Sequence, residues 1–264
     1  PLPPAMLNVL LLLGGLAPAL PQHWPEGHPA CGGRAQSPID VATGRARLDP
    51  ALPPLQPQGY DHPETPRFTL ANNGHTAVLA LPPSLRLQGL PGAFAAAQLH
   101  FHWGRPGHAA GAEHLLDGHR APAEMHVVHF DAERFSDAGE AQHHAGGLAV
   151  LGVLLEVRTP NPPPQSPQTH TDTPLPRQST SIPSFNVQDL LPPRLDRYYR
   201  YNGSLTTPPC FQSVLWTLFP EPVHISRDQV WGTLLSLLVD NFRAPQELNQ
   251  RPVLVSFPRG ELGG

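Results

Sequence analysis

Proline is the residue that most constrains what this chain can fold into. The 264 residues include 36 prolines. Because proline lacks a backbone donor and breaks helix interiors, the sequence predicts many loops and few, short helices. Between about residues 36 and 99, short apolar runs alternate with Gly, Pro and Asn, a pattern typical of short strands joined by tight turns. Longer apolar runs at 146–157, 213–219 and 252–257 predict further strands of a large sheet.

Length and charge narrow the class of protein. A chain of this length can form one large domain with an extensive core. The formal net charge is −4 and only 14% of the residues are charged, so the chain offers no basic stripe of the kind that nucleic-acid binding needs. We therefore expect a single domain and no nucleic-acid partner.

Two histidines stand one residue apart in the run AAQLHFHWG at residues 96–104. Side chains of a strand alternate between its two faces, so Gln98, His100 and His102 would line the same face. Two half-exposed histidines on a sheet surface would give the same pattern, and a second observation is needed to choose between these interpretations.

The second observation is the run AEMHVVHF at residues 123–130, in which Glu124 and His126 share a face by the same alternation. Three neutral imidazoles on neighbouring strands can converge on one tetrahedral ion and leave the fourth position to water, as catalytic zinc sites do. The spacing therefore predicts a zinc site, provided that the two strands adjoin.

The start of the chain is typical of a secretory signal. Residues 1–20 contain the apolar run MLNVLLLLGGLAPAL, which ends in small residues and is too short to span a membrane; a buried apolar segment is the alternative. No later apolar run reaches the length of a spanning helix. In an oxidising compartment Cys31 and Cys210 would form one disulfide, and Asn202 begins the glycosylation triplet Asn-Gly-Ser.

One segment stands apart in composition. Residues 158–183 are dense in Pro, Ser and Thr and poor in apolar residues. This composition predicts an extended or disordered surface loop. Residues 259–264 would form a short C-terminal tail.

Several motifs together resemble the α-class carbonic anhydrases, especially their extracellular, membrane-associated members. The motifs are QSPID (36–40), NNGH (72–75), QLHFHWG (98–104), AEH (112–114), AEMHVVH (123–129), GLAVLG (147–152), YNGSLTTPPC (201–210) and NFRAPQELNQR (241–251). The resemblance implies an α+β catalytic domain over residues 21–258, built on a large, mostly antiparallel, twisted central sheet with few short helices. It also implies reversible hydration of carbon dioxide to bicarbonate and a proton, with inhibition by sulfonamides and anions.

The resemblance assigns a role to each motif residue. It implies that His100, His102 and His126 bind Zn²⁺, and that the partners of their other ring nitrogens are Gln98, Glu124 and the backbone carbonyl of Asn241. Thr206 and Glu113 would orient the attacking hydroxide, and His75 would carry the released proton to buffer. The substrate pocket would be formed by Val128, Val150, Leu205, Thr207, Val214 and Trp216, for which plain core packing is the alternative. Two further histidines, His114 and His129, would serve packing and hydrogen bonding.

The chain also departs from the family pattern. An N-terminal tyrosine is missing ahead of His23 and Trp24, and Val78 replaces a usual polar residue, so proton transfer is expected to be slow. The segment 158–183 replaces a family helix, which would expose sheet surface, and the segment 229–244 is shorter than usual.

Alternatives to an active carbonic anhydrase remain open from the sequence alone. One is an interaction module that has the fold without full activity. Another is the product of an imperfect gene model that does not fold stably. A different zinc hydrolase is a third, although the chain contains no H-E-x-x-H motif. We expect a protein of the secretory pathway, either extracellular or held at the cell surface by an anchor outside this chain.

Overall fold

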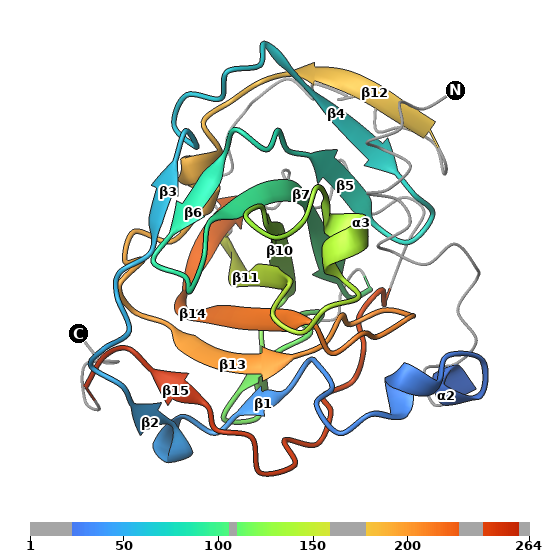
Figure 1. Ribbon diagram of the computed structural model, residues 1–264, viewed down its shortest axis with the longest axis vertical. Coiled ribbons are helices and arrows are strands. Elements are labelled where there is room, and N and C mark those ends of the chain that lie inside the picture. The colour runs from blue at the N-terminus through green and yellow to red at the C-terminus, as the bar shows by residue number, and fades with distance from the viewer. Residues whose placement is uncertain (1–22, 106–109, 159–177, 227–239, 259–264) are drawn as a thin grey trace.

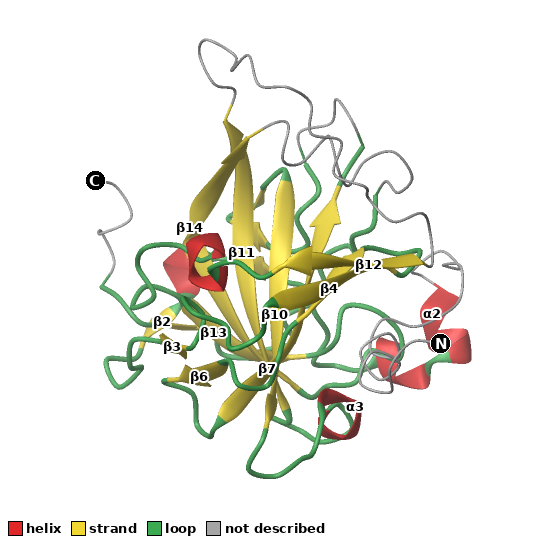
Figure 2. Ribbon diagram, turned by 90° about the horizontal axis from the view of Figure 1, so that it is seen from above, coloured by secondary structure: helices red, strands yellow, loops and turns green. Residues whose placement is uncertain are grey.

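One large twisted sheet runs through most of the described chain (Figures 1 and 2). This computed structural model describes residues 23–105, 110–158, 178–226 and 240–258. Its 12-stranded sheet has the neighbour order β12-β4-β5-β7-β10-β11-β14-β13-β15-β2, and β6 pairs with both β3 and β7. A separate three-stranded sheet has the order β1-β8-β9.

The strands differ widely in length. Four long strands form the centre: β7 (Phe94–Trp103), β10 (Ala123–Asp131), β11 (Leu148–Arg158) and β14 (Val214–Ser226). Around them lie β2 (Arg47–Leu48), β3 (Gln56–Gln58), β4 (Arg67–Asn72), β5 (Ala77–Ala80), β6 (Arg86–Gln88), β12 (Gln178–Pro183), β13 (Tyr199–Gly203) and β15 (Leu254–Val255). The small sheet contains β1 (Asp40–Val41), β8 (Leu115–Leu116) and β9 (His119–Arg120).

Most neighbouring strands of the large sheet are antiparallel. The exceptions are the parallel pairs β11 with β14 and β15 with β2. The predicted fold class, with a large and mostly antiparallel sheet, is confirmed. The apolar runs predicted as strands at 146–157 and 213–219 correspond to β11 and β14, whereas only two residues of 252–257 pair as a strand.

Helices in the described residues are few and short, as the prolines predict. The two α-helices are α2 (Trp24–Gly27) and α3 (Ala138–Ala141), and the 3-10 turns are Pro29–Gly32, Thr43–Arg45 and Val187–Leu190. Asp137 caps α3 by accepting a hydrogen bond from the Glu140 N–H, which satisfies a donor that the helix itself leaves unpaired. No helix in these ranges is long and apolar enough to cross a membrane.

The central strands are largely buried on both faces, and β11 accordingly begins with a long run of apolar residues and glycine. All nine residues of β10 are buried. Alternate residues of β10 and β11 enter two different apolar clusters, because neighbouring side chains point to opposite faces. One cluster contains Val128, Val150 and Trp216. The other contains Leu99, Val127 and Leu151.

The prediction of a surface loop over 158–183 is wrong at both of its ends. Arg158 closes β11, and Gln178–Pro183 form the sheet-edge strand β12, paired antiparallel with β4. The β-branched residues Thr180 and Ile182 suit a strand, and a proline is tolerated at the end of an edge strand. The intervening residues 159–177 lie outside the described residues.

Other predictions also fall outside the described ranges. They concern the signal segment at 1–20, the tail at 259–264 and most of the shortened segment 229–244. Replacement of a family helix was expected to expose sheet surface. Within the described ranges the exposed large apolar side chains are Leu48 and Phe185, so extensive exposure is not seen there.

Candidate active site

The pairing of β7 with β10 brings the three predicted histidines together. His126 lies directly opposite His100 in the antiparallel register, and Glu124 lies opposite His102. One ring nitrogen from each of the three histidines lies within 4.8 Å of the others, and all three side chains are buried. The condition set by the sequence, that the two strands adjoin, is therefore met.

A hydrogen bond fixes the other ring nitrogen of each histidine. His100 Nδ1 donates to Gln98 Oε1 at 2.9 Å, and His102 Nδ1 donates to the Asn241 carbonyl at 2.7 Å. His126 uses the opposite nitrogen, since its Nε2 donates to Glu124 Oε1 at 2.7 Å. The acceptors are oxygens, so each ring nitrogen that faces the shared space carries a lone pair.

These lone pairs converge without a proton between them. His102 Nε2 and His126 Nδ1 are 3.1 Å apart. Two nitrogens bound to one zinc at about 2.0–2.1 Å with tetrahedral angles would be about 3.3–3.4 Å apart, which is close to this distance. A cation would remove the repulsion between the lone pairs. Three imidazoles with a fourth position left open are typical donors of a catalytic zinc site.

The three histidines are held in the neutral form that metal binding requires. Burial, with the nearby His102 and His126, holds the pKa of His100 well below its usual value. Burial lowers the pKa of His102 to about 4, and it also lowers the pKa of His126. Neutral imidazoles accept a metal ion without first releasing a proton.

Glu124 is a buried carboxylate with four hydrogen bonds. Its Oε2 accepts the backbone N–H groups of Glu113 and His114, both at 2.8 Å, and its Oε1 accepts ring N–H groups of His114 and His126, both at 2.7 Å. Burial alone would raise the pKa of Glu124, but His114 and His126 hold it well below its usual value. Glu124 is therefore an ionised acceptor that fixes the orientation of the His126 ring.

A buried chain of polar groups continues from Glu124 through His114 to Tyr201 and Ser37. His114 Nε2 lies 2.7 Å from the Tyr201 hydroxyl, which is hydrogen-bonded to the Ser37 hydroxyl at 2.8 Å. The Ser37 hydroxyl also accepts the Ser204 N–H at 3.0 Å. Sequence reasoning assigned His114 to hydrogen bonding but missed Ser37 and Tyr201, which lie 164 residues apart.

Glu113 stands beside the histidines. Its Oε1 accepts the Arg243 backbone N–H at 2.8 Å, and its Oε2 lies 3.5 Å from His102 Nε2. This Oε2 atom is buried without a hydrogen-bonding partner among the described residues. Burial raises the pKa of Glu113 above its ordinary value, although the Arg243 N–H and the nearby Thr206 hydroxyl favour the ionised form.

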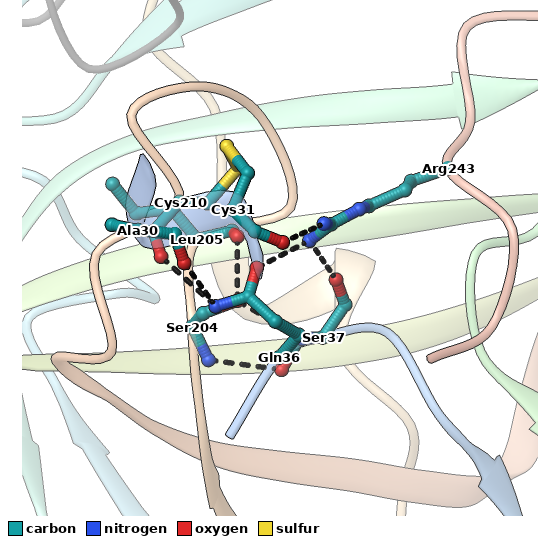
Figure 3. The surroundings of a disulfide bond; sticks show 8 residues. All are labelled: Ala30, Cys31, Gln36, Ser37, Ser204, Leu205, Cys210 and Arg243. Carbon is teal, nitrogen blue, oxygen red and sulfur yellow. Dashed lines mark hydrogen bonds between the residues drawn. A yellow bond between two sulfur atoms is a disulfide. The ribbon is translucent and has the colours of Figure 1, made fainter. Parts of the chain in front are cut away.

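A disulfide and a hydrogen bond from Gln36 Nε2 to the Cys210 carbonyl join the segment that carries Thr206 to the segment 31–37, which Arg243 contacts (Figure 3). Cys31 and Cys210 are bonded, so the predicted disulfide is present in the structure. The Arg243 guanidinium donates to Gln36 Oε1 and to the carbonyls of Ser37 and Cys31, at 2.9–3.1 Å. This role of Arg243 could not be predicted from local sequence patterns, because its partners lie more than 200 residues away.

The apolar residues proposed for the substrate pocket lie together. Val128 is opposite Val150, and Val150 is opposite Trp216, so the three form a row across β10, β11 and β14. The Trp216 ring centroid is 4.8 Å from that of His126. The same buried cluster also contains Leu205 and Val214, whereas Thr207 is half-buried.

His75 lies in the turn between β4 and β5 and is half-buried. Its backbone N–H donates to Asn73 Oδ1 at 2.9 Å, and its carbonyl accepts from Asn241 Nδ2 at 3.0 Å. Val78, two residues into β5, is opposite His100 and adds a buried apolar side chain beside the histidines.

The sequence matches the family model for eukaryotic-type carbonic anhydrases over residues 19–257. The chain belongs to this family. It is 40% identical to human carbonic anhydrase 12 over 90% of this chain and 71% of that protein. Identity to human carbonic anhydrase 6 is 38%, over 97% and 90% of the two chains. Identity to mouse carbonic anhydrase 15 is also 38%, over 92% and 78%.

Proposed function

We propose that this carbonic anhydrase hydrates carbon dioxide reversibly to bicarbonate and a proton, with one zinc ion bound by His100, His102 and His126. The observation that carries the proposal is the convergence of three buried, neutral imidazoles, each oriented by a hydrogen bond to its other nitrogen. In carbonic anhydrases, the standard example of this chemistry, bound zinc lowers the pKa of a water molecule to about 7 and so supplies a nucleophile at neutral pH.

Thr206 and Glu113 would orient the nucleophile. Glu113 Oε1 is committed to the Arg243 N–H, which leaves Oε2 to accept the Thr206 hydroxyl proton. Once the Thr206 oxygen donates its proton to Glu113, it can only accept a hydrogen bond from the nucleophile. This order of donors fixes the direction of the attacking lone pair.

Carbon dioxide carries no charge and no donor, so it requires an apolar place beside the nucleophile. The row formed by Val128, Val150 and Trp216 offers such a surface next to His126, with Leu205 and Val214 in the same cluster. We assign these residues, together with Thr207 at the rim, to the substrate pocket.

The hydration step releases a proton, which must reach the solvent for turnover to continue. Histidine is the side chain whose ordinary pKa lies closest to neutrality. His75 is half-buried in a turn that a hydrogen bond joins to Asn241, the residue whose carbonyl also holds His102. We assign His75 to the transfer of this proton to buffer.

Two independent features support a location in the secretory pathway. The Cys31–Cys210 disulfide fits an oxidising compartment. Asn202 is exposed on β13, as a glycosylated asparagine must be. We propose an extracellular or cell-surface protein that sulfonamides and anions inhibit at the zinc site.

Removal and return of the metal test the proposed function. Zinc content and carbon dioxide hydration are measured on the same preparation, before chelation, after chelation and after addition of zinc. The variant His102→Ala should bind less zinc and lose hydration, whereas His119→Ala, which removes an exposed histidine, should change neither. A folded protein that takes up one zinc and remains inactive would instead favour an interaction module with this fold.

A further inference from the structure

The ladder between β5 and β7 ends in an unusual way. Its last pair in the direction of the turn is Val78 opposite His100. At the next residue of β7, Phe101, a side chain replaces the backbone partner: the Phe101 N–H donates to Thr76 Oγ1 at 3.2 Å, and the Thr76 hydroxyl donates to the Phe101 carbonyl at 2.6 Å. The Thr76 side chain is buried, with 3% of its surface exposed.

Because the Thr76 hydroxyl takes the place of a backbone partner, the chain can turn away from the sheet at Thr76 while the Phe101 N–H and carbonyl stay hydrogen-bonded. The residue that comes just before Thr76 is His75. Phe101 lies between the zinc-ligand candidates His100 and His102. The Thr76 hydroxyl thus joins the turn that carries the proton-transfer residue to the backbone segment that carries two of the three histidines.

A second side chain holds the same turn. Asn241 Nδ2 donates to the carbonyls of both His75 and Phe101 at 3.0 Å, while its Oδ1 accepts the Trp103 N–H at 2.7 Å. The turn is also internally fixed, since Asn73 Oδ1 accepts the N–H groups of His75 and Thr76 at 2.8–2.9 Å. Anchors at residues 75 and 76 therefore determine where the whole turn lies.

We propose that Thr76 is a positioning residue for proton transfer, whose hydroxyl holds the His75 backbone at a fixed place relative to the zinc ligands. This proposal rests on the proposed function. With the backbone fixed, the His75 imidazole takes up the proton released by hydration and passes it to buffer by movement of its side chain alone. Loss of the hydroxyl would spread the positions of the ring and lower the fraction of time in which a proton can be transferred.

The test compares Thr76→Val, which keeps the shape and removes the hydroxyl, with Thr76→Ser, which keeps the hydroxyl. In carbon dioxide hydration at low buffer concentration we expect Thr76→Val to lower kcat about three- to tenfold, and kcat/KM by less than about twofold. Thr76→Ser should restore kcat. Added imidazole, which replaces the internal proton carrier, should raise kcat of Thr76→Val towards the wild-type value.

A structural readout separates positioning from a general loss of stability. In the protein loaded with Co²⁺, paramagnetic relaxation of the His75 ring protons reports the distance between the metal and the imidazole. We expect weaker relaxation in Thr76→Val and wild-type relaxation in Thr76→Ser. If Thr76→Val does not fold, Thr76→Ala replaces it, because water can fill the space and pair with Phe101 without holding the turn.

The outcomes distinguish this proposal from the function on which it rests. A wild-type protein that shows no hydration with zinc bound would overturn both. If the wild type is active and His75→Ala lowers kcat, the proposed function holds. In that case, an unchanged kcat and unchanged relaxation in Thr76→Val would overturn the role of Thr76 alone. An equal fall of kcat and kcat/KM without rescue by imidazole would also overturn it.

Discussion

The Nε2 atom of His102 lies 3.1 Å from the Nδ1 atom of His126, on neighbouring strands of the central sheet. Both nitrogens carry lone pairs, because the other nitrogen of each ring donates to an oxygen. Groups of the protein itself therefore hold the rings in the orientation that a shared cation needs. This preorganisation depends on the hydrogen-bonding partners as much as on the histidines.

Loss of the Glu124 carboxylate should weaken zinc binding. In Glu124→Gln the amide replaces an ionised acceptor of four hydrogen bonds, and the His126 ring is no longer fixed. We expect zinc affinity, measured by competition with a chelator, to fall roughly 10–100-fold. Glu133→Gln at an exposed position is the matched control and should retain wild-type affinity. Equal affinity in the two variants would contradict a role for Glu124 in holding the metal.

A methyl group at Gly203 should destabilise the protein. A Cβ atom there would clash with the Ser37 Oγ atom, which is hydrogen-bonded to Tyr201 and Ser204. Gly203→Ala should lower the free energy of unfolding in urea by about 1–3 kcal/mol. At Gly44 an added Cβ meets nothing within 4 Å, so Gly44→Ala should change stability by less than about 0.5 kcal/mol. Equal effects of the two substitutions would show that Ser37 is free to move.

The disulfide should contribute strongly to stability. It joins residues 179 positions apart in the sequence, and cross-links that close long loops restrict the unfolded chain most. We expect the double variant Cys31→Ser, Cys210→Ser to lose roughly 2–5 kcal/mol of unfolding free energy. A reducing agent should destabilise the wild type and leave the double variant unaffected. Wild-type stability that does not respond to full reduction would argue against this contribution.

The metal-free protein should lose stability as the pH falls below neutrality. Burial lowers the pKa of His102 and of His129 to about 4, so the folded state resists protonation at pH values where the unfolded chain accepts protons. The contribution of each histidine to the free energy of unfolding, about 3 kcal/mol, is complete above about pH 6.5 and is lost as the pH falls towards 4. Urea unfolding in the presence of a chelator, between pH 7 and pH 4, measures this change. Stability that is constant or rising across this interval would contradict it.

Local alternation predicted the core of the candidate metal site from the sequence. The rule that every second side chain of a strand shares a face placed His100 and His102 together, and Glu124 with His126. The register that sets His126 opposite His100 could not be derived from either run alone, because it depends on how two separate strands pair. Contacts that join distant segments, such as Ser37 with Tyr201, left no local pattern in the sequence.

At the edges of the sheet, the amino-acid composition of a segment predicts its structure less well than the presence of a neighbouring strand with which it can pair. The segment 178–183 is polar and contains a proline, yet it forms β12 because β4 offers an unpaired edge. Thr76 is a similar case, since a threonine after a histidine in a turn gives no sign that its hydroxyl completes the hydrogen bonding of Phe101. The roles of Thr206, Glu113 and His75 came from resemblance to the family and remain proposals.

Stopped-flow measurement of carbon dioxide hydration, on a preparation whose zinc content is known and with buffer concentration varied, tests the proposed zinc-dependent activity most directly. We expect one zinc per chain, hydration that disappears when zinc is removed, and a rate that rises with buffer concentration because proton transfer limits turnover. A folded, zinc-loaded protein that hydrates carbon dioxide no faster than buffer alone would contradict the proposed activity.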